Sequence, residues 1–255
     1  MKAKIQHEIQ EYCSLLRLNA ISEHLEEAIA SATDYEGFLH QLLRMEVDAE
    51  EARAKERKIK AAKFPYRKYI EDLEMDLLPE GMRKRLPELC TLDFIREGKN
   101  IIMTGNPGTG KTHTAIGLGI KACEQGYRVL YTTIPYLVTE LKESNSKQKL
   151  RTYQKRFEKY DLIIADELGY ISFDREAADL LFTVLSLRAS QKSTIITSNL
   201  TFERWDEIFG DAGYSIMHGN EQLFASKYKL YLPTESSEML PLQVQSLIGL
   251  HIKLI

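Results

Sequence analysis

The sequence predicts an α/β protein whose parallel sheet is flanked by helices on both faces and preceded by a small all-α N-terminal module. From about residue 99 onward, short apolar runs alternate with amphipathic helical patterns, which is typical of parallel sheets. Before that point, residues such as Ile5, Ile9 and Tyr12 recur at helical spacing. The 255 residues are 44% hydrophobic and 28% charged, which allows a substantial core and excludes a wholly disordered chain.

Charge balance and cysteine usage narrow the class of protein. The chain has 34 Lys and Arg against 37 Asp and Glu, a net charge of −3, so its total charge does not imply polyanion binding. Cys13, Cys90 and Cys123 are far apart in the sequence, which argues against a disulfide framework and favours a reducing, cytoplasmic setting. The apolar run at 242–255 contains polar residues and is too short to span a bilayer, so we expect no membrane partner.

Residues 1–65 are predicted to form the helical module. Thr33 to Glu36 resembles a capping box with Thr33 as N-cap, and the helix that it starts could continue to about Ala62 before Pro65 ends it. The apolar stripes of these helices need a partner surface, either one another or another subunit.

A basic stretch ends this module. Met1 to Ala52 holds four basic and eleven acidic residues, whereas Arg53 to Tyr69 holds eight basic residues and one acid. Interleaved cations and aromatic rings suit phosphates and bases, so the stretch is a candidate DNA-binding segment. The alternative is a solvated helix face that the upstream acids neutralise. The candidate residues are Arg53, Lys55, Arg57, Lys58, Lys60, Lys63, Arg67 and Lys68.

Residues 66–98 are predicted to be a linker with a basic start, because Pro79, Gly81, Pro87 and Gly98 punctuate it. Residues 99–211 carry the sheet. Its expected strands are 100–104, 128–133, 161–165 and 194–197, and its expected helices are 112–125, 135–143, 151–159 and 176–189. Further on, Tyr228–Leu232 alternates as a strand does and could complete the sheet.

The segment from Gly105 to Thr112 matches the phosphate-binding motif GxxxxGK[ST]. It follows a predicted strand and opens a predicted helix, which is the context that this motif requires. Glycines let backbone N–H groups point into one cavity, and the helix N-terminus adds positive charge where phosphates sit. Lys111 would reach the β- and γ-phosphates of ATP, and the Thr112 hydroxyl would ligate Mg²⁺. The predicted cofactor-binding residues are Gly105, Asn106, Pro107, Gly108, Thr109, Gly110, Lys111, Thr112, His113 and Asp166, of which His113 is expected to be an ordinary helix residue.

Two carboxylates end the strand in DLIIADE, about 55 residues after Lys111. Asp166 is placed to hold Mg²⁺, directly or through water, and Glu167 to polarise the attacking water. Asn199 ends the strand in STIITSNL. An isolated terminal Asn is more often a turn former, but as the third strand end in this series Asn199 is a candidate nucleotide sensor. We therefore predict Glu167, Lys111 and Asn199 as the catalytic residues.

These motifs together resemble the IstB family of insertion-sequence helper ATPases. GNPGTGKTH, LIIADELGY and STIITSNLTFERW occur in this order, and AKFPYRKYIEDLE before them also fits the IstB pattern. The likeness covers about residues 1–211. The family is related to the DnaC-type helicase loaders, and both belong to the AAA+ group of P-loop ATPases.

The resemblance implies properties that periodicity does not show. The Asn199 strand should lie between the strands that lead to Lys111 and to Asp166. The chain should form an ATP-dependent homo-oligomer on double-stranded DNA, bend the DNA, and recruit or stimulate a transposase (integrase). The helical module would then aid DNA binding and self-association.

The segment 212–255 departs from this pattern, so the C-terminal lid is atypical. Family members continue beyond Phe209–Asp211 into a helix with an Asp-Arg pair and have a later Arg, whereas this chain has no arginine after Arg204. A frameshift in the coding sequence would explain the difference, and genuine divergence is the alternative. An arginine finger can be worth about 10³–10⁵ in turnover. We therefore expect nucleotide binding with impaired hydrolysis, with Arg175 and Arg188 as substitutes to consider.

Three functions remain open: an ATP-dependent helper of DNA transposition, a replicative helicase loader, and an ATP-switched DNA-binding scaffold that does not hydrolyse ATP. A helicase loader would prefer single strands and bind a helicase. A small-molecule kinase is a distant fourth, because the chain lacks an arginine-rich lid.

Overall fold

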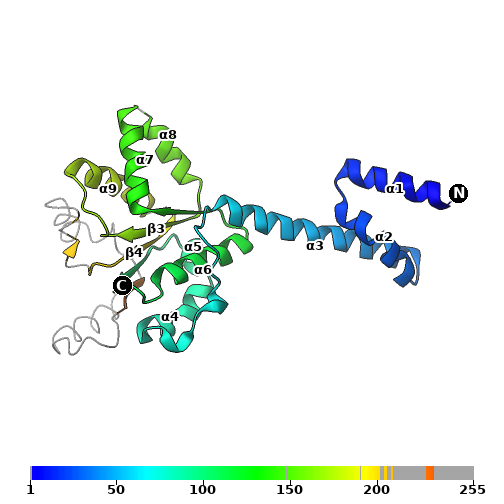
Figure 1. The fold of residues 1–255 in the computed structure, drawn as a ribbon, viewed down its shortest axis with the longest axis horizontal. Helices are drawn as coiled ribbons and strands as arrows, with labels where there is room; N and C mark the ends of the chain where they lie inside the picture. The colour runs from blue at the N-terminus through cyan, green and yellow to red at the C-terminus, as the bar shows by residue number, and fades with distance from the viewer. Residues whose placement is uncertain are drawn as a thin grey trace. The chain divides into compact units, whose positions relative to one another are not determined.

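The chain folds as two compact units, Met1–Lys58 and Ile59–Ile255, in a computed structural model that describes residues 2–147, 149–189, 191–201, 204–205, 208 and 228–232. The first unit is helical and the second contains the sheet (Figure 1). None of the helices in these described ranges is long and apolar enough to cross a membrane.

The first unit consists of α1 (Lys2–Leu16), α2 (Asn19–Ser31) and most of α3 (Tyr35–Ala61). Its small core contains Ile21, Leu25 and Leu42. Other large apolar side chains stay in solvent; Leu15 is 79% exposed and Tyr35 is 94% exposed. The three helices therefore bury only part of their apolar stripes against one another.

The N-cap of α3 is Asp34, so the prediction of Thr33 is wrong by one residue. The helix begins at Tyr35, and the Gly37 N–H donates to Asp34 Oδ1 at 2.7 Å. Thr33 instead turns its hydroxyl to Asp34 Oδ2 at 3.2 Å. An aspartate is at least as good a cap as a threonine, and its position next to the first helical residue decides between them. The helix ends at Ala61, as the position of Pro65 predicts.

The second unit contains a parallel sheet in the order β2-β3-β4-β1-β5. Its strands are β1 (Ile101–Gly105), β2 (Val129–Thr133), β3 (Leu162–Leu168), β4 (Ser193–Ser198) and β5 (Tyr228–Leu232). The predicted place of β4, between β1 and β3, is confirmed, and so is the strand at Tyr228–Leu232. Because all strands run the same way, the residues that follow β1, β3 and β4 meet at one edge of the sheet.

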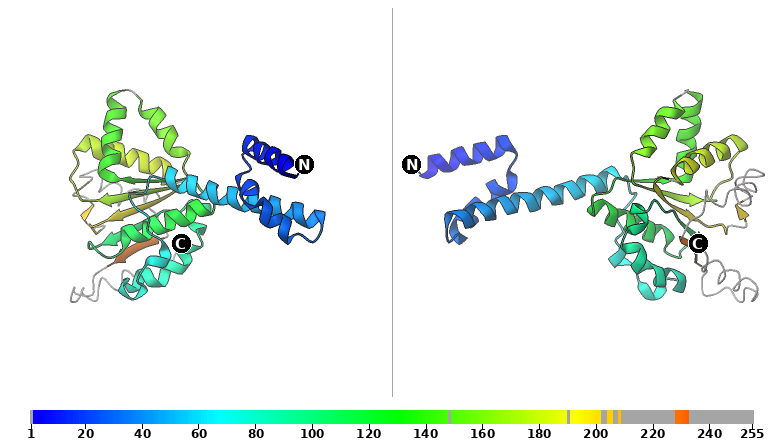
Figure 2. Two further views of the ribbon diagram at one scale, coloured as in Figure 1. Left: turned by 45° about the vertical axis from the view of Figure 1, so that its right-hand side comes forward. Right: turned by 180° about the vertical axis from the view of Figure 1, so that it is seen from behind.

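Helices cover both faces of this sheet, as predicted (Figure 2). On one face lie α4 (Glu80–Cys90), α5 (Asp93–Arg96) and α6 (Lys111–Glu124), and on the other lie α7 (Ile134–Ser146), α8 (Leu150–Glu158) and α9 (Arg175–Ala189). Alternate residues of β1 separate the two cores. Ile101 and Met103 pack with the first group of helices, whereas Ile102 packs with the second.

The segment 66–98, expected to be a linker, is built into the second unit. It forms the short 3₁₀ turns η1 (Ile70–Asp72) and η2 (Met75–Leu77) before α4 and α5. Met82 and Leu89 of α4 and Phe94 of α5 are almost wholly buried in the sheet core. Pro87 lies inside α4. An amphipathic stripe therefore maintains a helix where the local sequence, with its prolines, favours a break.

A buried arginine links the amino-terminal ends of β3 and β4 through hydrogen bonds. Arg188 of α9 is 3% exposed, and its guanidinium donates to the carbonyl oxygens of Phe157 at 2.5 Å, Tyr160 at 3.2 Å and Ser193 at 3.0 Å. Burial lowers its pKa to about 10. Arg188 is thus a structural residue inside the fold, which removes it as a substitute arginine finger. Arg175 is exposed at the start of α9.

We expect Arg188→Ala to lower the free energy of unfolding by about 3 kcal/mol, because two buried carbonyl groups and one part-buried carbonyl group lose a charged donor. Denaturant unfolding followed by circular dichroism measures this loss. Arg175→Ala, in the exposed first turn of the same helix, should change the stability by less than about 0.5 kcal/mol. Equal stabilities for the two variants would contradict the assignment.

Candidate functional site

The loop between β1 and α6 forms an open cradle. Gly108 and Gly110 have φ angles of +83° and +80°, a left-handed conformation that glycine adopts without steric cost. A Cβ atom added at Gly108 would have no other atom within 4 Å, so the space beside it is free. Asn106 and Pro107 are exposed at the rim. At the base of the loop, α6 begins at Lys111 and directs its first, unbonded N–H groups toward this space.

Lys111 folds back over the loop. Its ammonium group donates to the carbonyl oxygens of Gly105 and Asn106, both at 2.6 Å, and to Thr109 Oγ1 at 3.2 Å. Burial lowers the pKa of Lys111, and the negative charge of Asp166 opposes that effect. The ammonium group is thus held by neutral oxygens at the mouth of the cradle, where a stronger anionic acceptor could replace them.

Asp166 is the most tightly held carboxylate of the site and is only 1% exposed. Its Oδ1 atom accepts from the hydroxyl of Thr112 at 3.0 Å and from the hydroxyl of Thr197. Its Oδ2 atom accepts from the hydroxyl of Tyr131 at 2.7 Å. Three hydroxyl groups from α6, β4 and β2 therefore surround the end of β3.

Glu167 lies in a bulge of β3. Ala165 pairs with Ile196 and Leu168 pairs with Ser198, so two residues of β3 lie opposite Thr197 alone. Glu167 has a φ of +68°, which is strained for a residue other than glycine, and its N–H donates to Thr197 Oγ1 at 3.1 Å. Burial raises the pKa of Glu167, and the charge of Asp166 raises it further. A raised pKa makes this carboxylate a better proton acceptor.

Asn199 follows β4 at the same edge. Its Oδ1 atom is buried, and nothing among the described residues donates a hydrogen bond to it. It lies against the turn after β3, where a Cβ at Gly169 would come within 2.7 Å of it. A buried amide oxygen without a partner is expensive, and such an atom at a sheet edge suits a group that faces a ligand. The sensor role of Asn199 stays a prediction.

His113 faces away from the cradle and toward the preceding segment. A ring nitrogen lies 2.8 Å from the carbonyl oxygen of Tyr69. The side chain therefore ties α6 to the segment before it, as expected for an ordinary helix residue.

The predicted DNA-binding residues lie along α3 and just beyond it. Two of them are paired with upstream acids. Arg53 donates to Glu46 at 2.6 Å and to Glu50 at 3.0 Å, and Arg57 donates to Glu50 at 2.7 Å. Glu46 also accepts from the Ile21 N–H at 3.1 Å, so Arg53 belongs to the packing of α3 on α2. Lys55, Lys60, Lys63, Arg67 and Lys68 are exposed, and Lys58 is half-buried.

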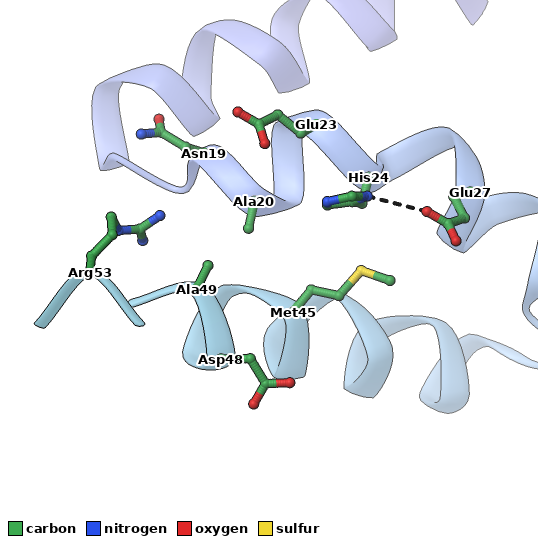
Figure 3. A pocket seen from close by; sticks show the side chains of 9 residues that line it. All are labelled: Asn19, Ala20, Glu23, His24, Glu27, Met45, Asp48, Ala49 and Arg53. Atoms are coloured by element: carbon green, nitrogen blue, oxygen red, sulfur yellow. Dashed lines mark hydrogen bonds and ion pairs between the residues drawn. The ribbon is translucent and has the colours of Figure 1, made fainter. Parts of the chain in front are cut away.

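A hollow in the helical unit does not have the chemistry of this loop. It has a volume of about 470 Å³ and lies between α2 and α3 (Figure 3). Glu23, Glu27 and Asp48 line it, and the Arg53 guanidinium at its end is already paired with acids. Carboxylates repel an anionic ligand. Nor do the described residues contain any group of three or more His, Cys, Asp or Glu that could hold a metal ion.

Tyr131 and Thr197 donate to Asp166, but the sequence motifs do not identify them. Tyr131 lies in the middle of β2 (VLYTT) and Thr197 lies near the carboxyl end of β4 (STIITS), and both strands contain other polar residues as well. A polar side chain within a buried strand is only a weak signal of function on its own. It becomes informative only once the strand order places it beside Asp166.

The chain matches the sequence model of the family described as IstB-like ATP binding protein over residues 13–216, which confirms the resemblance. It is 36% identical over 212 residues to a Geobacillus stearothermophilus protein named as an ATP-binding protein of insertion sequence IS5376, with 82% of this chain and 84% of that one covered. It is 35% identical over 209 residues to a Pseudomonas aeruginosa protein named in the same way for insertion sequence IS21, covering 80% and 79%.

Solved structures share the fold. The crystal structure of DnaI superimposes with a TM-score of 0.54 at 20% identity, covering 65% of this chain and 91% of that one. The AMPPCP-bound DnaA from Aquifex aeolicus gives a TM-score of 0.51 at 20% identity, covering 73% and 56%. These likenesses confirm the predicted AAA+ type of parallel sheet flanked by helices.

We expect Thr197→Val to lower the free energy of unfolding by about 2 kcal/mol, because Asp166 Oδ1 loses a donor and the Glu167 N–H loses its acceptor. Denaturant unfolding measures the change.

Thr194→Val is the matched control for this variant. Thr194 lies in the same strand and is 3% exposed against 2% for Thr197, but its hydroxyl has no hydrogen-bond partner among the described residues. This second variant should be neutral or slightly stabilising. If Thr194→Val lowered the free energy of unfolding as much as Thr197→Val does, the loss in both variants would come from the changed shape of the side chain and not from lost hydrogen bonds.

Proposed function

Because the chain belongs to the IstB-like ATP-binding protein family, we propose that it binds ATP with Mg²⁺ in the cradle and hydrolyses it. We propose further that it assembles as a homo-oligomer on double-stranded DNA and recruits or stimulates a transposase. One observation carries the first part of the proposal. Lys111, Thr112, Asp166 and Glu167 meet at one edge of the sheet, with Thr112 Oγ1 and Asp166 Oδ1 3.0 Å apart.

The residues present fit a magnesium ion. A hydroxyl and a carboxylate are oxygen ligands of the kind that Mg²⁺ takes together with waters and substrate phosphates. Thr112 and Asp166 would hold it, and the ion when bound supplies charge neutralisation beside the β- and γ-phosphates.

The remaining chemistry belongs to the chain. Backbone N–H groups of the loop and of the first turn of α6 receive the phosphates, and Lys111 exchanges the Gly105 and Asn106 carbonyls for phosphate oxygens. Glu167 accepts a proton from the attacking water while the oxygen of that water bonds to the γ-phosphorus. The bond from that phosphorus to the bridging oxygen breaks, and ADP leaves with phosphate as the second product. Asn199 orients the water or contacts the γ-phosphate.

The missing arginines favour a second candidate function. The chain has no arginine after Arg204, and the buried Arg188 donates to backbone carbonyl groups within the same chain. If no arginine reaches the phosphates from a neighbouring subunit, ATP is held without turnover, and the chain acts as a nucleotide-switched DNA-binding scaffold.

We assign DNA contact to the exposed part of the basic stretch and self-association to the helical module. The lysines of α3 and of the segment after it carry positive charge into solvent. Leu15, Leu16 and Tyr35 expose most of their apolar surface in the helical unit, which suits contact with another subunit.

Lys111→Ala should abolish the binding of a fluorescent ATP analogue, because the variant removes the charged donor that the cradle offers to phosphates. Glu167→Gln should leave that binding within about threefold of the unaltered chain and should remove phosphate release. Equilibrium titration and a phosphate assay measure the two effects. If Lys111→Ala bound the ATP analogue with unaltered affinity, that result would contradict the proposed site. Binding without phosphate release in the unaltered chain would select the scaffold function.

Filter binding to duplex DNA with ATP, with ADP and without nucleotide, across a salt series, tests the second part of the proposal. Affinity for duplex should rise with ATP and fall steeply with salt. Replacing Lys55, Lys60, Lys63 and Lys68 together by Gln should reduce the salt slope by about one for each of these lysines that binds a phosphate.

Four exposed cations at other places serve as the control. Replacing Lys147, Arg151, Lys155 and Lys159 by Gln removes the same charge from the region of α8. That variant should keep the slope of the unaltered chain. Affinity that ignores both nucleotide and salt would remove the DNA-helper function, and preference for single strands would indicate a helicase loader instead.

A further inference from the structure

Tyr131 has no part in the mechanism above, yet its hydroxyl donates to Asp166 Oδ2 at 2.7 Å. The residue lies in the middle of β2 and is 8% exposed. The other carboxylate oxygen, Oδ1, accepts from Thr112 and Thr197. Tyr131 is therefore the donor that holds the Oδ2 side of this carboxylate among the residues described.

The surroundings of Tyr131 fix it in place. Its backbone N–H donates to the carbonyl oxygen of Ala62 at 2.8 Å, outside the ladder of the sheet. Its ring lies 6.3 Å from the ring of Phe64, tilted by 58°. Phe64 in turn rests on α6, where a Cβ at Gly119 would come within 2.9 Å of the ring. The phenol is thus held by the segment that follows α3 and by the helix of the phosphate loop.

The hydroxyl of Tyr131 is a hydrogen-bond donor, because a tyrosine phenol is protonated at neutral pH. A fixed, protonated phenol is well suited to orient a carboxylate, because rotation about the last side-chain bond of an aspartate is otherwise soft.

Orientation matters at this position because Asp166 would hold the ion together with Thr112. An ion bound to Thr112 Oγ1 would take a lone pair of that oxygen, and the Thr112 O–H would still donate to Asp166 Oδ1. The Tyr131 hydroxyl holds the other oxygen, Oδ2, and so fixes the plane of the carboxylate. Partners of this kind, which hold a ligand without touching the ion, typically contribute about 10–100-fold to metal affinity.

We propose that Tyr131 is a positioning residue of the nucleotide site and orients Asp166 for the divalent ion that accompanies ATP. The proposal rests on the proposed function, since it concerns the ion at that site. It assigns Tyr131 no contact with nucleotide or ion. The segment that carries Ala62 and Phe64 thereby becomes part of the support of the site, although it precedes the phosphate loop by about 40 residues.

Tyr131→Phe tests this proposal, because it removes the hydroxyl and keeps the ring against Phe64. Binding of a fluorescent ATP analogue to the full chain is titrated with MgCl₂ and repeated in EDTA. We expect the Mg²⁺ concentration for half-maximal enhancement to rise about tenfold, whereas binding in EDTA stays the same. An unchanged Mg²⁺ requirement overturns the proposal.

Tyr153→Phe is a closely matched control. Tyr153 is also 8% exposed, its hydroxyl also donates to a carboxylate, Glu140, at 2.5 Å, and its ring also packs on a phenylalanine. It lies in α8, outside the site. This variant should keep the Mg²⁺ requirement of the unaltered chain, and an equal rise in both variants overturns the proposal as a general loss of packing.

A double-variant cycle separates positioning from structure. In the Asp166→Asn background, Tyr131→Phe should cause no further change in the Mg²⁺ requirement, because the tyrosine acts through the carboxylate. Independent, additive effects overturn the proposal. If the unaltered chain binds no ATP analogue at all, the proposed function itself has failed, and that result is read before any variant is made.

Discussion

A carboxylate that is 1% exposed is tolerable only when its oxygens are hydrogen-bonded, and this requirement organises the carboxyl edge of the sheet. Thr112, Tyr131 and Thr197 come from α6, β2 and β4, and each brings a hydroxyl to Asp166 on β3. The partners of one buried charge thus connect the phosphate-loop helix with three neighbouring strands. Burial raises the pKa of Glu167 and the charge of the same carboxylate raises it further, so Asp166 affects both the stability of this edge and the protonation of its neighbour.

Local sequence predicts those parts of the fold that depend on local pattern. Each of the four apolar strands, the glycine loop and the Asp166–Glu167 pair is a contiguous stretch of sequence. The structure places the strand ends within one residue of expectation, except that β3 continues to Leu168, three residues beyond its predicted end. Asn199 can be identified because it, too, ends a strand. Tyr131 and Thr197 cannot be identified from the local sequence. Their importance comes from hydrogen bonds to Asp166, which is more than 30 positions away from each of them. The helix α4 escapes prediction for a similar reason, since burial of Met82 and Leu89 outweighs the proline within it.

The segment just after α3 has two kinds of neighbour. Lys63, Arg67 and Lys68 expose their charges, whereas Ala62 and Phe64, on either side of Lys63, pack on β2 and α6. Burial and the charges of Asp166 and Glu167 raise the pKa of Tyr66, which brings this phenol into the electrostatic field of the acid pair. The stretch that composition indicates as a polyanion-binding surface therefore also lies within the electrostatic reach of the Asp166–Glu167 pair, a combination that no linear motif describes.

The bulge in β3 makes the length of that strand as important as its composition. Asp166 and Glu167 together face Thr197, and normal pairing resumes at Leu168, whose carbonyl oxygen accepts from Ser198 Oγ at 2.9 Å. Removing either acid by an in-frame deletion would leave one residue opposite Thr197 and so abolish the bulge, together with the backbone conformation at φ +68° that places Glu167 after Asp166. Across evolution this short stretch should therefore accept exchanges of side chains far more readily than insertions or deletions of a codon.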